Sequence, residues 1–147
     1  MRTISVNVKS KAIHWGVASV LTLLSGGVNA HTLTGSIPAS KTAVVKWQTT
    51  CGPNTAQMVF RLQQAAKQNF SVSLKVSSGE VSETVTTSGM KKIWTPNASV
   101  AAGAGVYLLT LSKIGSNPNK AISYTVEEHC HNAAGQEVAQ TKPVRVR

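Results

Sequence analysis

Three histidines that follow residue 30 are the side chains whose type and spacing could support chemistry. His129 and His131 stand two residues apart, on either side of Cys130. Residues at this spacing on a β-strand share one face, with their side chains roughly 7 Å apart. Two imidazoles at that separation can converge on one metal ion at nitrogen distances of ~2.0–2.1 Å. The pattern therefore predicts a metal-ligating pair on the outward face of a strand.

The third histidine, His31, gains its interest from the segment before it. Residues 1–15 carry three basic residues and no acidic one, residues 16–25 are a short apolar stretch, and residues 26–30 supply small side chains for cleavage after Ala30. This order is typical of an export signal peptide. A membrane anchor is the alternative, but a stretch of ten residues that includes serine and threonine is too short to cross a hydrocarbon layer of ~30 Å. We expect residues 1–30 to be removed and the mature chain, residues 31–147, to be periplasmic or secreted, without a membrane span.

A mature chain that begins with His31 would add an imidazole and an α-amine to the possible ligands. The pKa of an α-amine, ~8, is low enough for a metal ion to displace the proton near neutral pH. Nitrogen ligands alone favour Cu(II), with Zn(II) next. The sequence thus predicts a metal site of His31, His129 and His131, with copper as its ion and zinc as the second choice.

In this one element the chain resembles the copper proteins that hold their ion in a histidine brace. Small exported β-sandwich copper carriers are among them, so the resemblance implies copper binding or copper carriage. The chain departs from the carrier pattern because it contains no Asp-x-His motif. In fact it contains no aspartate, and its five acidic residues are all glutamates.

The lack of aspartate excludes several kinds of chemistry. A Ser-His-Asp triad, an EF-hand and an Asp-rich magnesium site all require aspartate. No pairing of a nucleophile with a histidine base suggests itself among so few histidines. We therefore expect a binding protein with no catalytic residues, not an enzyme.

Export makes the two cysteines informative. In an oxidising compartment Cys51 and Cys130 are expected to form a disulfide. Closing a loop of 79 residues would stabilise the fold by roughly 4 kcal/mol in the chain-entropy model. The alternative is two free thiols acting as ligands or redox centres, which no C-x-x-C spacing supports.

Alternation of apolar and polar residues predicts the elements that must position these side chains. Turn signals separate the segments at short intervals. The predicted strands are residues 43–51, 57–63, 69–77, 81–87, 90–95, 106–114, 121–131 and 137–147. Residues 106–114 are apolar on both parities, which predicts a central strand covered on both sides. A helix over residues 55–68 is the one competing element.

Seven or eight short strands predict an all-β fold, an antiparallel β-sandwich, in residues 31–147 as a single domain. The expected disulfide would tie an early strand to the penultimate one, with Trp47 on the same face as Cys51. This core arrangement resembles that of immunoglobulin-like sandwiches.

The basic surface suggests a different function from metal binding. The chain has 15 basic and 5 acidic residues, and without residues 1–30 the net charge is +7. A metal-free adhesion or interaction module could use such a surface to bind an anionic surface or a partner protein. No nucleic acid is expected, because the chain has no recognition helix, RNP-like aromatic pair or basic arm. Carbohydrate binding around Trp94 is a third interpretation.

Two glutamates accompany the histidine pair. Glu127 would share the outward face with the histidines, either orienting an imidazole by a hydrogen bond or serving as a surface charge. Glu128 would point inward, where a carboxylate needs a partner such as lysine or a strand end open to water.

Overall fold

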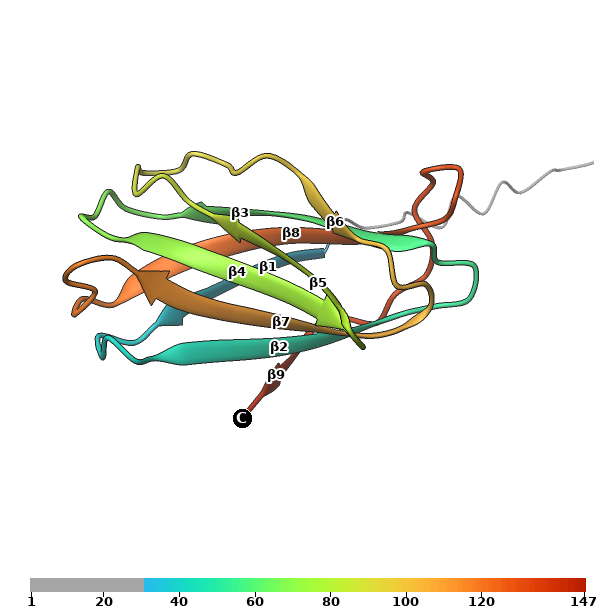
Figure 1. Cartoon of the computed structure of the whole chain (residues 1–147), viewed down its shortest axis with the longest axis horizontal. Coiled ribbons are helices and arrows are strands. Elements are labelled where there is room, and N and C mark those ends of the chain that lie inside the picture. Colours follow the sequence, from blue (N-terminus) through green and yellow to red (C-terminus); the bar gives the residue numbers. More distant parts are fainter. Residues whose placement is uncertain (1–30) are drawn as a thin grey trace, which may run out of the picture.

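The computed structural model describes residues 31–147, which form nine β-strands and no helix (Figure 1). The strands are β1 (His31–Ile37), β2 (Val44–Cys51), β3 (Gln57–Gln64), β4 (Ser71–Ser78), β5 (Val81–Thr86), β6 (Ala98–Val100), β7 (Gly105–Ile114), β8 (Ile122–His131) and β9 (Val144–Val146). The predicted export signal, residues 1–30, lies outside the described residues. Within residues 31–147 no helix is long and apolar enough to cross a membrane.

The strands form two antiparallel sheets that pack face to face (Figure 1). One sheet has the order β1-β8-β3-β6, and the other has the order β5-β4-β7-β2-β9. Each strand presents alternate residues to the space between the sheets, because side chains along a strand point to opposite faces. On β3, for example, Met58, Phe60 and Leu62 are buried while the residues between them are partly exposed. The prediction of an all-β sandwich is confirmed.

The predicted disulfide is also confirmed, and it joins the two sheets. Cys51 ends β2 in the five-stranded sheet, Cys130 lies on β8 in the four-stranded sheet, and their Cα atoms are 5.7 Å apart. Both cysteines are buried. A second link between the sheets follows from Trp47, whose Nε1–H donates to the Tyr124 hydroxyl at 2.8 Å. Trp47 is half-buried against the core, as its position on the face of Cys51 predicts.

Residues 57–64 form β3, which confirms the predicted strand over residues 57–63 and excludes the competing helix over residues 55–68. Three other features differ from the sequence-based expectation. β1 is a strand that alternation did not reveal. Residues 90–95 form a turn and an irregular segment, and the short β6 follows them. In the predicted last strand, only Val144–Val146 pairs regularly, because residues 137–143 cross from one sheet to the other and make only isolated bridges at Glu137 and Gln140.

The expectation that β7 is covered on both faces is wrong. β7 is central, between β4 and β2, and Tyr107, Leu109 and Leu111 are fully buried on its inner face. Nothing in residues 31–147 forms a second layer over its outer face, so Val106 and Ile114 are 50% and 52% exposed. The apolar residues on this outer parity therefore contact solvent within the described part of the chain.

Candidate functional site

The three histidines do not share one face of the sheet. β1 pairs with β8 in a register that sets His31 opposite Glu128. Paired residues on neighbouring strands point to the same side, and Glu128 is fully buried on the inner side. His31 therefore lies on the inner side, whereas His129 and His131 lie on the outer parity of β8. The structure brings His129 and His131 together and leaves His31 on the opposite face.

The outer pair lies in a shallow polar pocket of about 300 Å³. The ring centroids of His129 and His131 are 6.0 Å apart, with an angle of 44° between the ring planes. Nδ1 of His129 is 3.1 Å from a carboxylate oxygen of Glu137, a contact that orients the ring and leaves Nε2 free. Among residues 31–147, no group of three or more histidine, cysteine or glutamate side chains is placed to hold a metal ion. The pocket thus offers two imidazole nitrogens, and water would have to complete the coordination shell of a bound ion.

His31 has different surroundings. It borders a pocket of about 240 Å³ at the edge between the sheets, together with Trp47, Lys142 and Pro143. Its Nδ1 atom is buried without a hydrogen-bond partner. A histidine in this position contacts the tail that crosses between the sheets and does not contribute to the outer pocket.

Glu127 pairs with an arginine, not with an imidazole. Nε of Arg61 donates to Oε2 of Glu127 at 2.7 Å, and the guanidinium lies 4.5 Å from the ring centre of Trp94. The outward position of Glu127 beside the histidines is thus as expected, but its hydrogen bonds hold Arg61. One face of Trp94 is covered by this guanidinium, which leaves less of the ring for stacking on a sugar.

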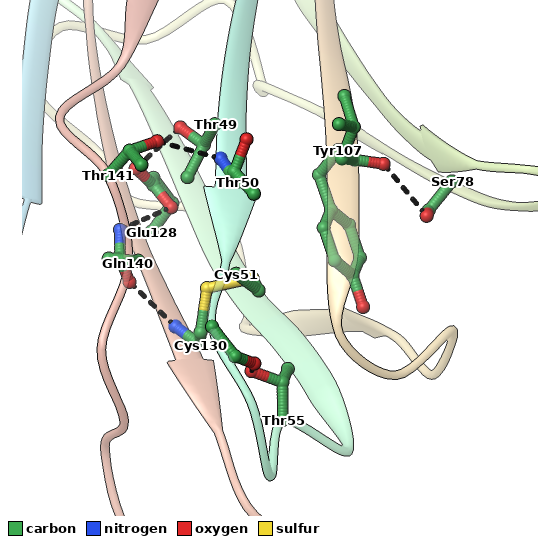
Figure 2. Close-up of a disulfide and its surroundings, with 12 residues drawn as sticks. Thr49, Thr50, Cys51, Thr55, Ser78, Tyr107, Glu128, Cys130, Gln140 and Thr141 are labelled. Carbon is green, nitrogen blue, oxygen red and sulfur yellow. Dashed lines mark hydrogen bonds between the residues drawn. A yellow bond between two sulfur atoms is a disulfide. The ribbon is translucent and has the colours of Figure 1, made fainter.

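Glu128 is a buried carboxylate held by neutral partners (Figure 2). The Thr49 hydroxyl donates to Oε1 at 3.2 Å, and the Gln140 side-chain amide donates to Oε2 at 2.9 Å. Burial disfavours the charged form and raises the pKa of Glu128 to about 7, although both hydrogen bonds act to lower the pKa. The same Gln140 side chain accepts a hydrogen bond from the backbone N–H of Cys130 at 2.8 Å. Glu128 therefore fastens the crossing tail beside the disulfide.

A second candidate site lies at one end of the sandwich, the end on the left of Figure 1. Because the paired strands run antiparallel, alternate connections gather at this end. We call the basic loop end the connections over residues 38–43, 65–70 and 115–121 together with residues 87–93, the first part of the connection between β5 and β6. Its five exposed basic side chains are Lys41, Lys67, Lys91, Lys92 and Lys120. None of these four connections contains a glutamate.

The connections at the opposite end do not carry this positive charge. Residues 52–56 and 101–104 are uncharged, the β4–β5 turn contains Glu80, and the β8–β9 connection contains Glu137 and Lys142. The long axis of the molecule therefore separates a positively charged end from a neutral to acidic one.

A buried lysine joins two connections of the basic loop end. Lys113, near the end of β7, is 7% exposed. Its Nζ donates to the backbone carbonyls of Pro38 and Lys120, at 2.5 Å and 2.9 Å. Burial lowers the pKa of Lys113. The two carbonyl bonds satisfy two of the three ammonium donors and hold the connections together.

The basic loop end also contains a polar pocket of about 510 Å³ between two of its connections. The lining side chains are Lys67, Gln68, Asn69, Asn117, Asn119 and Lys120. Two ammonium groups and four amides can supply N–H donors to a phosphate, sulfate or carboxylate group. The arrangement fits an anionic ligand.

This cluster was not predicted from the sequence. The signal was nevertheless present, because the first, third, fifth and seventh connections all contain lysine and no acidic residue. Antiparallel neighbours place such alternate connections at the same end. The cluster emerges only with the observed strands, because the predicted set lacked β1 and placed Lys91 and Lys92 inside a strand over residues 90–95.

Comparison of the chain with protein-family models, with curated proteins and with solved structures finds no match.

Proposed function

We propose that the mature chain is an exported, non-enzymatic binding protein, periplasmic or secreted, that holds an anionic partner through the basic loop end. One observation carries this proposal: four neighbouring connections present five exposed lysines and no acidic residue. Clustered charge of one sign attracts ligands of the other sign and speeds their encounter. The polar pocket between two of the connections supplies amide donors next to the lysines.

Removing two lysines from this pocket should weaken anion binding more than removing two lysines elsewhere. We expect Lys67→Gln with Lys120→Gln to lower the affinity for heparin, a polyanionic probe, by roughly tenfold or more, since each lost ammonium removes a direct charge contact. The matched control is Lys46→Gln with Lys75→Gln, because both lysines are exposed on the outer face of the five-stranded sheet and the net charge changes equally. Affinity is measured by titration calorimetry at several salt concentrations.

The binding should weaken steeply as salt rises, because exposed charges are screened over ~10 Å at 0.1 M ionic strength. Equal losses in the pocket variant and in the control would show that only net charge matters and would contradict a site at the basic loop end. Binding that does not change with salt would contradict the electrostatic basis of the proposal.

Metal binding at His129 and His131 is a second candidate, favoured by the 6.0 Å separation of the two rings. Cu(II) is the preferred ion and Zn(II) the next, because the available ligands are imidazole nitrogens. A copper-carrier function would follow if the pair binds Cu(II) reversibly. The contact with Glu137 would orient His129 toward such an ion.

Titration of the processed chain with Cu(II) tests this candidate. We expect His131→Asn to lower the affinity for Cu(II) at least roughly tenfold, since one of two imidazole ligands is lost. One extra residue before His31 should leave the affinity unchanged, because His31 lies on the inner side of the sheet. A loss caused by the extra residue would instead support participation of the terminal amine, and unchanged binding by His131→Asn would exclude the pair.

A further inference from the structure

Apolar side chains accompany the lysines at the basic loop end. Seven large apolar side chains are exposed in residues 31–147, and four of them lie in or directly beside the four connections. These four are Val44, Met90, Ile93 and Ile114, which are 51%, 46%, 54% and 52% exposed. A purely ionic ligand would make no favourable contact with these apolar side chains. They therefore indicate a partner that has both charged and apolar groups.

Met90 and Ile93 flank two of the lysines on a turn that is fixed at its base. The buried Gly89 accepts hydrogen bonds through its carbonyl from the backbone N–H of Gln68 and the side-chain amide of Gln64. The N–H of Lys92 donates to the carbonyl of Gln64 at 2.8 Å. These bonds tie the turn to the end of β3, while residues 90–93 remain exposed.

Two residues of this turn have positive φ angles. Gly89 has a φ of 79° and Lys92 a φ of 52°, both in the left-handed region. For a lysine this region is uncommon. The hydrogen-bonded base and these dihedral angles place Met90-Lys91-Lys92-Ile93 in an exposed turn, with an apolar residue on each side of two lysines.

We infer that the anionic partner of the basic loop end is a phospholipid bilayer surface, which the tip at residues 90–93 enters. This inference rests on the proposed function and names its partner. Lysines bind lipid phosphates at the headgroup level, and apolar side chains are buried at the boundary between headgroups and acyl chains. Both chemistries are required at neighbouring positions, and both are present on this turn. A soluble polyanion would satisfy the lysines alone.

The charge around the tip matches such a surface. Lys67 and Lys120 lie on neighbouring connections, and no acidic residue occurs in any of the four connections to repel the phosphates. A lysine near an anionic leaflet contributes roughly fivefold to the binding constant. Burial of an apolar side chain contributes roughly tenfold. Several such contributions together give measurable binding without a membrane-spanning element.

Sedimentation with lipid vesicles tests the inference. The exported chain is mixed with vesicles of phosphatidylglycerol and phosphatidylcholine, with vesicles of phosphatidylcholine alone, and separately with heparin. We expect the chain to bind heparin and the anionic vesicles but not the vesicles of phosphatidylcholine alone. Met90→Ser and Ile93→Ser together should lower the affinity for the anionic vesicles roughly 100-fold. The matched control is Val106→Ser with Val144→Ser, since these side chains are 50% and 57% exposed but lie outside the basic loop end.

The outcomes separate the inference from the function on which it rests. The inference is supported if the Met90/Ile93 variant loses vesicle binding, keeps its heparin affinity and unfolds at the temperature of the parent. It is overturned if this variant binds vesicles as the parent does, or if the parent binds heparin but no anionic vesicle; the proposed function survives both results. A parent chain that binds neither probe overturns the proposed function as well.

Discussion

Replacement of both cysteines by alanine is expected to lower the free energy of unfolding by about 4 kcal/mol. The disulfide closes a loop of 79 residues. In the chain-entropy model such a cross-link lowers the conformational entropy of the unfolded chain, which raises the free energy of unfolding by about this amount. The effect is large against a total stability of ~5–15 kcal/mol for a domain of ordinary size. Urea unfolding of the parent and of the Cys51→Ala, Cys130→Ala chain measures the difference.

Reduction of the parent chain by dithiothreitol provides the control, because it opens the loop without removing the two buried sulfur atoms. The reduced parent should lose most of the same stability. The alanine chain should lose slightly more, because removal of the two buried sulfur atoms also leaves a cavity at positions 51 and 130. A loss below about 1 kcal/mol in both would contradict a stabilising role for the cross-link.

The second large effect is a loss of stability as pH rises, caused by Glu128. In the folded chain the pKa of Glu128 is about 7, against an ordinary value of 4.5. Between these two values the folded state keeps a proton that the unfolded state has lost, so stability falls with rising pH. The fall begins near pH 4.5, totals about 3 kcal/mol and ends above pH 7, where both states are ionised.

Glu128→Gln isolates this contribution, because the other titrating groups are common to both chains. The variant should match the parent near pH 4.5 and become more stable than the parent as pH rises toward 8, by up to about 3 kcal/mol. Urea unfolding at several pH values, with a chelator present to exclude metal ions, measures the difference. A difference that stays constant with pH would contradict the raised pKa.

Much of the fold was predictable because several of its strands, β3 and β8 among them, alternate between buried and partly exposed residues. Met58, Phe60 and Leu62 follow a period of two and are all buried, so local sequence was sufficient for β3. β1 was not predicted because its inner face contains Gly35, which interrupts the alternation of apolar and polar residues. Glycine is needed at this position because of a residue far away in the sequence. A Cβ atom added to Gly35 would clash with the Tyr124 side chain, 2.8 Å from its Cζ atom. The requirement comes from the neighbouring strand and cannot be read locally.

In the candidate site too, some features follow from local sequence and others depend on how the strands pair. The shared face of His129 and His131 follows from their spacing on one strand, which sequence alone provides. The side on which His31 lies depends on the register between β1 and β8, where a shift by one residue would reverse it. The register that forms sets His31 opposite Glu128. Likewise, the neutral partners of Glu128 come from β2 and from the crossing tail, at separations of 79 and 12 residues.

The unequal ends of the sandwich give the molecule an electric dipole along its length. Five exposed lysines lie at one end, while the connections of the other end contain Glu80, Glu137 and a single lysine, Lys142. A negatively charged surface would exert a torque on such a dipole over about a Debye length, ~8 Å at physiological salt, and turn its positive end toward itself. The molecule would therefore be rotated before contact and would arrive standing on its lysine-rich end. His129 and His131, near the far end of β8, would then face the solution, free to meet a second ligand.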